Sequence, residues 1–199
     1  MSHYFHTPDG PANFREVQLR FWDTDWAFTT AAGVFSADGL DLGTAVLLRE
    51  STPPAHARRL LDLGCGYGVI AVGLAYACPD AVVDAVDTNE RALELCATNA
   101  GRAGVADRVR PMLPEQADPD ARYDEIWSNP PIRIGKAALH ELLLTWLPRL
   151  APGGVARLVV GRNLGADSLQ AWLNTQGYRC ERRASAKGFR VFSVVIETQ

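Results

Sequence analysis

Two short segments contain residues whose types and spacing are suited to chemistry. The first covers residues 62–68 (DLGCGYG), between an apolar run and a helix-like run. Its glycines alternate as GxGxG and Val69 follows, so the GxGxxG pattern of dinucleotide-binding loops is not met. Such a turn lets the backbone approach an uncharged sugar or amino-acid group closely. Asp87 follows 19 residues beyond Gly68, where its carboxylate can accept hydrogen bonds from both hydroxyls of a ribose.

The glycine loop, the strand after it and the acid together resemble the class I S-adenosylmethionine-dependent methyltransferases. The resemblance implies S-adenosylmethionine as the cofactor. The alternative for the glycines alone is a turn that holds no ligand. The expected cofactor-binding residues in this part of the chain are Asp62, Gly64, Cys65, Gly66, Gly68, Asp87 and Thr88.

The second segment is the run Asn129-Pro130-Pro131-Ile132, which follows a strand-like stretch. It resembles the (N/D)PPY-type motif of amino-methyltransferases, which implies a catalytic role for these four residues. An exocyclic amine on a base is a poor nucleophile because its lone pair is delocalised into the ring. The Asn129 side-chain oxygen and the Pro130 carbonyl can accept both N–H groups and favour a pyramidal nitrogen. The alternative is an ordinary turn that ends a strand.

The fourth residue of this motif is aromatic in many relatives and stacks on the base, whereas here it is Ile132. An aliphatic side chain can form a wall beside a base but lacks a π-surface. The stacking partner is therefore open among Phe35, Trp26 and the guanidinium plane of Arg133.

Hydrophobic patterning predicts strands alternating with helices along most of the chain. The expected strands cover 58–64, 81–87, 108–113, 123–128, 155–160, 178–184 and 189–197, and the expected helices 69–78, 89–101, 136–150 and 166–176. This alternation indicates an α/β, doubly wound, mostly parallel seven-stranded sheet of the Rossmann-like methyltransferase type. The last two strands are joined by a turn too short for a crossover, so they must pair antiparallel.

The domain division expected from the sequence is an N-terminal extension over 1–50 and a cofactor-binding domain over 51–199. The extension contains a β-hairpin (17–22 and 27–35) and a helix (43–50), and it packs on the core. Pro53-Pro54 marks the join.

Several further runs resemble small-subunit ribosomal-RNA guanine-N2 methyltransferases of the methyltransferase small domain family. They are residues 33–36 (GVFS), 39–44 (GLDLGT), 136–140 (KxxxH), 164–169 (LGADSL) and 187–191 (KGFRV). The resemblance implies that Phe35 and Thr44 lie near the methionine end of the cofactor and Asn129 at the target amine, and Thr44 and Asn129 are also expected to bind the cofactor. Bacterial members often carry two tandem halves, and this chain has one.

The net charge of −3 conceals a split along the sequence. Residues 1–130 carry a net charge of −9 and residues 131–199 a net charge of +6, so we expect a polyanion to meet the C-terminal third. The expected substrate-binding residues are Phe35, Arg133, Lys136, Lys187 and Arg190. Solvated surface charge is the alternative for the basic residues.

The expected partner is ribosomal RNA or a ribosomal subunit, without DNA, for a monomer or a homodimer. The sequence has no apolar run of membrane-spanning length and no secretory signal, so we expect a cytoplasmic protein. The scattered cysteines are expected to be reduced, no metal site is expected, and His140 is expected to pack or cap. Two other functions stay open: an N-methyltransferase for a protein glutamine or a small amine or guanidine metabolite, and a catalytically inactive cofactor-binding module.

Overall fold

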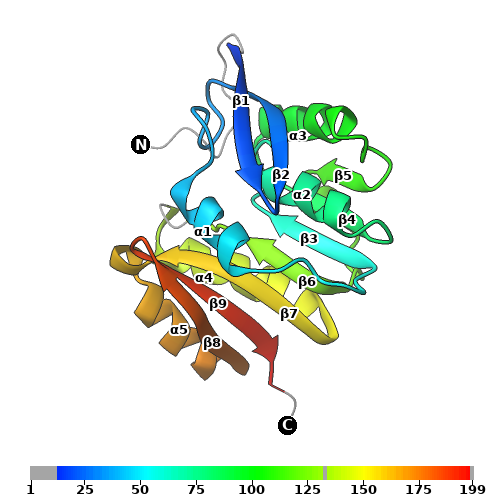
Figure 1. The fold of residues 1–199 in the computed structure, drawn as a ribbon. Helices are drawn as coiled ribbons and strands as arrows, with labels where there is room; N and C mark the ends of the chain where they lie inside the picture. Colours follow the sequence, from blue (N-terminus) through cyan, green and yellow to red (C-terminus); the bar gives the residue numbers. More distant parts are fainter. Residues whose placement is uncertain (1–12, 132–133, 198–199) are drawn as a thin grey trace.

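The fold is that of a computed structural model, which describes residues 13–131 and 134–197. Its centre is a seven-stranded sheet in the order β5-β4-β3-β6-β7-β9-β8, with a separate two-stranded hairpin, β1-β2 (Figure 1). The strands are β1 (Phe14–Phe21), β2 (Thr24–Ala31), β3 (Arg59–Leu63), β4 (Val82–Val86), β5 (Val109–Met112), β6 (Tyr123–Ser128), β7 (Leu150–Gly161), β8 (Tyr178–Ala186) and β9 (Phe189–Ile196).

The strand directions confirm the predicted fold class. Strands β3 to β7 run parallel, and β9 lies antiparallel between β7 and β8. The turn at Lys187 and Gly188 is too short for a crossover, so β8 and β9 pair as a hairpin. This turn places the first residue of β9 opposite Gly161, at the carboxyl end of β7.

Helices cover both faces of the sheet. They are α1 (Leu42–Glu50), α2 (Val69–Ala77), α3 (Glu90–Arg102), α4 (Lys136–Trp146) and α5 (Ala166–Thr175). Helices α1, α2 and α3 share one apolar core with the hairpin, and α4 and α5 share a second core on the other face (Figure 1). Within the described ranges, no helix combines the length and apolar character needed to cross a membrane.

The turn of the N-terminal hairpin is formed by residue types that are unusual in such a turn. Trp22 and Asp23 form the two-residue turn, with φ of 47° and 56°, and Phe21 pairs with Thr24. A turn with two left-handed residues normally contains Asn or Gly, so the sequence pattern predicts the turn later, between residues 22 and 27. Packing compensates for the strain, since the Trp22 indole donates to the Leu48 carbonyl at 2.8 Å.

Strand β7 begins five residues earlier than predicted. The sequence predicts that the run Pro152-Gly153-Gly154 precedes the strand, but this run forms an irregularity inside it, where the register with β6 shifts. A Cβ at Gly154 would lie 2.8 Å from the Tyr123 carbonyl oxygen, so only glycine fits against β6 there.

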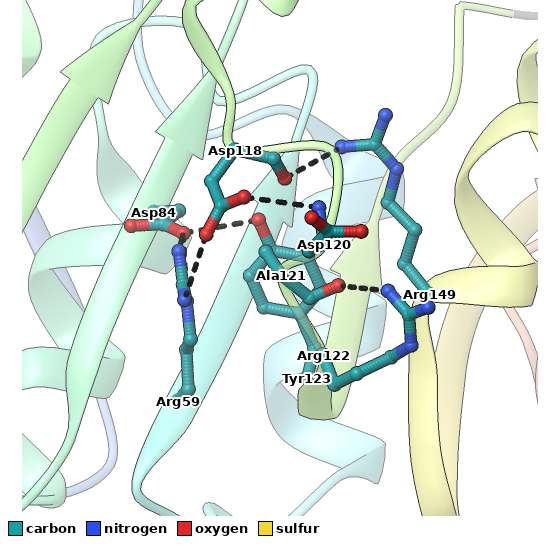
Figure 2. A network of polar contacts seen from close by, with 8 residues as sticks. All are labelled: Arg59, Asp84, Asp118, Asp120, Ala121, Arg122, Tyr123 and Arg149. Carbon is teal, nitrogen blue, oxygen red and sulfur yellow. Dashed lines mark hydrogen bonds and ion pairs between the residues drawn. The ribbon is translucent and has the colours of Figure 1, made fainter.

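A buried ion-pair network ties together β3, β4 and β6, and it involves the first residues of β3 and β6 (Figure 2). Asp84 is buried and accepts hydrogen bonds from Arg59 at 2.9 Å and from the Tyr123 hydroxyl at 3.0 Å. Burying a carboxylate without partners is unfavourable in free energy, so the contacts with Arg59 and Tyr123 are what allow Asp84 to lie inside the sheet. The candidate site lies at the other end of the same strands.

Candidate functional site

A cleft of about 450 Å³ opens where β3, β4 and β6 reach their carboxyl ends. Gly64 and Gly66 line it after β3, Asp87 after β4 and Asn129 after β6. A smaller recess of about 40 Å³ shares several of these residues and also contains Thr44 and Cys65. Cofactor sites typically enclose about 300 to 1,000 Å³, and open α/β sheets bind ligands at this edge. The fold therefore brings both sequence motifs to one cavity.

The glycine loop is built so that backbone lines the cleft. Gly64, Gly66 and Gly68 all have positive φ, at 79°, 53° and 93°. A Cβ at Gly68 would lie 2.7 Å from the Sγ and 3.1 Å from the Cα of Cys96 in α3. Gly68 is thus required by its conformation and by the close packing of α2 against α3.

Asp62 supports the loop from inside the protein and is not among the lining residues of the cleft. It is fully buried at the end of β3, and its Oδ2 accepts the backbone N–H of Ala71 in α2 at 2.9 Å. Burial raises the pKa of this carboxyl to about 8, and Asp87 nearby adds to the rise. Its Oδ1 has no hydrogen-bond partner in the described structure, so the protonated form predominates at neutral pH.

Asp87 joins the glycine loop to the start of α3. Its Oδ2 accepts from Gly66 N at 2.9 Å, and its Oδ1 accepts from Asn89 N at 3.0 Å. Burial raises the pKa of Asp87, and these backbone donors act in the opposite direction. The backbone N–H of Thr88 also donates to this carboxylate, so three of its roughly four acceptor positions are occupied and one remains for a hydroxyl group in the cleft. Thr88, the next residue, is exposed and lines the same wall.

Asn129 meets the start of α1 across the cleft floor. Its Nδ2 donates to Asp41 Oδ2 at 2.7 Å and to Thr44 Oγ1 at 3.0 Å. The sequence predicts that Thr44 contacts the cofactor, and the structure brings it to the Asn129 amide. Pro130 is buried and Pro131 half-buried, and both line the cleft. Ile132, the fourth motif residue, lies outside the described residues.

The expected substrate-binding residues fall into three groups. Phe35 lines the cleft with 45% of its surface exposed. Lys136 and Lys187 are exposed, Lys136 at the start of α4 and Lys187 in the β8–β9 turn. The Arg190 side chain is only 15% exposed, and its guanidinium group is ion-paired with Asp167. Arg133 lies outside the described residues.

Sequence reasoning missed several residues of the cleft. Asn89 caps α3, and its Nδ2 donates to the Gly33 carbonyl at 2.9 Å. The Tyr67 hydroxyl donates to the Gly39 carbonyl at 2.8 Å, so the segment carrying Phe35 is attached at two points. Asn89 could have been found as a polar residue before a helix, a common N-cap position. Its contact with Gly33 depends on tertiary structure.

Phe189 was missed although it lies in one of the runs that carry the family resemblance. It begins β9 and lines the cleft beside Leu164. A Cβ at Gly43 would lie 3.0 Å from the Phe189 ring and 3.3 Å from Asn129 Nδ2. An aromatic ring therefore lies close to the Asn129 amide, contributed by β9 and not by the motif itself.

Other candidates are placed in structural roles. Trp26 is buried in the hairpin core, stacked on Phe21, and does not line the cleft. The His140 ring stacks on Trp172 at 3.5 Å between centroids, and burial together with Lys136 lowers its pKa. Among the described residues, no group of three or more His, Cys, Asp or Glu side chains forms a metal cluster.

The cysteines are buried and free of disulfides. A hydrogen bond with Cys96, together with burial, raises the pKa of the Cys65 thiol. This thiol is thus held protonated next to the loop, where it lines the smaller recess.

Comparisons with known proteins agree with this arrangement. The profile of the family described as "Methyltransferase small domain" matches residues 25–193. The chain is 32% identical to "Uncharacterized protein YbxB" of Bacillus subtilis (strain 168) over 168 residues, which cover 83% of this chain and 84% of that protein. It is 38% identical to "Ribosomal RNA small subunit methyltransferase C" of Hahella chejuensis over 77% of this chain and 48% of that protein.

The fold is similar to that of a solved 16S rRNA N2 methyltransferase (RsmC) from T. thermophilus in complex with AdoMet and guanosine. The TM-score is 0.76 at 23% identity, over 94% of this chain and 52% of that chain. This chain spans about half the length of the rRNA methyltransferases that it matches. On the strength of the profile match over most of its length, the chain belongs to the methyltransferase small domain family of S-adenosylmethionine-dependent methyltransferases.

Proposed function

We propose that this protein methylates the exocyclic N2 amine of a guanine in ribosomal RNA. The observation that carries the proposal is the position of Asn129-Pro130-Pro131 on the wall of the cleft that the glycine loop and Asp87 also line. The rRNA methyltransferases among the relatives support the choice of substrate. In the related solved complex, the ligands named are AdoMet and guanosine.

The residues of the cleft fit S-adenosylmethionine. The positive-φ glycines expose backbone to the ligand, and Asp87 provides carboxylate oxygens at the same wall. When bound, the cofactor supplies an electrophilic methyl group on a sulfonium. The protein holds the amine opposite it: Asn129 Oδ1 and the Pro130 carbonyl accept the two N–H bonds. Held in this way, the amine would direct its lone pair at the methyl group, and its surplus proton would pass to solvent after transfer.

The acceptors around the amine are preorganised by the fold. The nitrogen becomes positively charged as it attacks, and acceptors already aimed at its N–H groups stabilise that charge without reorganisation. Pro130 and Pro131 restrict the backbone, which fixes the direction of the carbonyl. Removing one such preorganised group typically lowers turnover by about 100-fold or more.

We assign base stacking to aromatic residues outside the motif. Phe35 and Phe189 both line the cleft. Phe189 is the first residue of β9 and lies close to the Asn129 amide. Stacking of a base on an aromatic ring contributes about 1–3 kcal/mol. Phe35 and Phe189 therefore take over the role that the aliphatic Ile132 cannot perform.

The RNA-facing surface is assigned to the edge of the sheet that carries the cleft. Lys136 and Lys187 are exposed there, each next to a cleft segment. Arg190 is assigned a structural role because Asp167 neutralises it. Of the basic residues expected to bind the substrate, Lys136 and Lys187 are thus the described ones left for phosphates near the target base.

The test is incubation with methyl-labelled S-adenosylmethionine and one substrate at a time, followed by nucleoside or amino-acid analysis. The substrates are small ribosomal subunits that lack the modification, the naked small-subunit rRNA, and a glutamine-containing peptide. We expect label in N2-methylguanosine from one of the RNA substrates and none with the Asn129→Ala variant. Label in methylglutamine would favour the protein N-methyltransferase instead. Cofactor binding without label in any substrate would favour a binding module.

A further inference from the structure

The Asn129 carboxamide has its orientation set by groups far away in the sequence. Its Nδ2 donates to Asp41 Oδ2 at 2.7 Å and to Thr44 Oγ1 at 3.0 Å, so both N–H bonds are used. A carboxylate only accepts hydrogen bonds, so the amide nitrogen must be the atom that faces Asp41. The flip that usually leaves an asparagine side chain ambiguous is therefore decided. Among the described residues, none donates a hydrogen bond to Asn129 Oδ1.

The Asp41 carboxylate is itself fixed by the start of α1. Asp41 is the N-cap of this helix, and its Oδ2 also accepts from Thr44 N at 2.9 Å. The contact with Asn129 requires close approach of the two segments. A Cβ at Gly43 would lie 2.9 Å from Asp41 Oδ2 and 3.3 Å from Asn129 Nδ2. Glycine at position 43 is what allows the helix start to reach the end of β6.

We propose that Asp41 is a positioning residue that acts through Asn129. It holds the amide nitrogen so that Oδ1 remains as a fixed acceptor in the cleft. The site then selects a substrate atom that carries N–H bonds and disfavours a carbonyl oxygen at the same place, because two acceptors repel. This inference rests on the proposed function, since it names the atom that recognises the target amine.

Two substitutions of Asp41 separate its contact with Asn129 from its role as a helix cap. Serine is a favoured N-cap and accepts from the same helix N–H, but its shorter side chain does not reach Asn129. Asparagine keeps both the length and an acceptor oxygen.

We expect Asp41→Ser to lower kcat about tenfold or more. The melting temperature and the dissociation constant for S-adenosylhomocysteine should stay near those of the wild type. Asp41→Asn should recover most of the lost turnover. Equal activity of the serine variant and the wild type would overturn the proposal.

A double-mutant cycle tests whether Asp41 acts through Asn129. In the Asn129→Ala background, Asp41→Ser should produce no further loss of kcat, because the group that it positions is already gone. A loss of the same size in both backgrounds would show that Asp41 acts independently, and the proposal would be wrong. A purely structural role of Asp41 predicts that additive outcome.

A spectroscopic measurement tests the positioning even if no substrate is methylated. In ¹⁵N-labelled protein, the Asn129 side-chain NH₂ resonances, assigned by their loss in Asn129→Ala, should exchange slowly with solvent. Asp41→Ser should speed this exchange about tenfold or more, and Asp41→Asn should keep it slow. Unchanged exchange in Asp41→Ser would overturn the inference and leave the proposed function standing. Faster exchange in Asp41→Ser, together with no methylated product from the wild type, would support the positioning role and overturn the proposed function.

Discussion

The Asn129 carboxamide has two polar ends, and the fold engages only one of them. The nitrogen donates to Asp41 and Thr44, and the oxygen accepts no hydrogen bond from the residues that the structure describes. A motif search finds an asparagine before two prolines but says nothing about which end of the amide faces the substrate. That choice is made by a carboxylate 88 positions earlier in the chain.

Asn129→Ala should lower turnover by about 100-fold or more, because one preorganised acceptor for developing charge is removed. The dissociation constant for S-adenosylmethionine should change little, since the other cleft walls remain. Calorimetry and single-turnover kinetics on the same preparation measure the two effects. Normal turnover with unchanged product would contradict the amino-methyltransferase mechanism.

Asn129→Asp should be active only at low pH. From the sequence alone, aspartate would be expected to keep an acceptor for the amine. In the structure, its carboxylate would lie against that of Asp41, and repulsion between the two charges would raise the pKa of one of them. Below the raised pKa of the pair, one proton can bridge them and the remaining oxygen can accept the amine. We therefore expect the ratio of variant to wild-type kcat to fall as pH rises from about 5 to 8. A ratio that is flat with pH would argue against the contact with Asp41.

At the scale of elements, the junction of β3, the glycine loop and α2 places the cofactor-binding backbone. Asp62 at the end of β3 accepts from the first turn of α2, and Gly68 allows α2 to pack against α3. Neither residue lines the cleft, so both affect cofactor binding through the position of the glycine loop.

Gly68→Ala should destabilise the protein and weaken cofactor binding. The added methyl group would meet Cys96 at 2.7 Å, at a positive φ that alanine rarely adopts. Overpacking of this kind costs about 1–3 kcal/mol. Gly101→Ala in α3 is the matched control, because nothing lies within 4 Å of the place that its methyl group would take and its backbone is helical. The control should raise the free energy of unfolding by about 0.5–1 kcal/mol. Chemical denaturation measures both, and equal effects would refute the packing argument.

Asp62→Asn should change how stability depends on pH. The folded state keeps Asp62 protonated up to its pKa of about 8, whereas the unfolded chain ionises it near 3.8. The stabilisation from the protonated group is therefore complete below the unfolded value and is lost as pH rises through the folded value. We expect the free energy of unfolding of the variant, relative to the wild type, to increase from about pH 4 to about pH 8. A constant difference over this range would show that Asp62 is ionised in the folded protein.

At the scale of the whole molecule, the charge split of the sequence maps onto two regions of the sheet. The more acidic first 130 residues supply β1 to β6, and the basic remainder supplies α4, α5 and β7 to β9. The cleft lies where these parts meet, with Asp87 on one wall and Phe189 on another.

Charge reversal at Lys187 or Lys136 should weaken RNA binding more than reversal at Arg58. Lys187 and Lys136 are exposed at the cleft edge, whereas Arg58 is exposed before β3, at the opposite end of the sheet. Loss of one phosphate contact should reduce the slope of log K against log salt by about 1. Filter binding or anisotropy at several salt concentrations measures this. Equal losses from all three substitutions would indicate that the split plays no part in RNA binding.

Much of this protein could be predicted from sequence because its signals are local. The alternation of apolar runs with helical patterns predicted every strand and helix of the sheet, and the glycine loop and Asp87 were placed at one edge by parallel topology alone. Short turns determined that β8 and β9 pair antiparallel. These features depend on backbone conformation and on periodicity, which neighbouring residues specify.

Tertiary structure decided what local patterns do not encode. The turn at Trp22 and Asp23 and the irregularity at Gly154 depend on packing against α1 and β6, which overrides residue preference. Phe189 joins the cleft because β9 is inserted between β7 and β8. Asp41 meets Asn129 because the start of α1 and the end of β6 converge at one edge. The segments that hold the candidate amine site are distant in sequence, and only burial of the shared cores on both sheet faces brings them into contact.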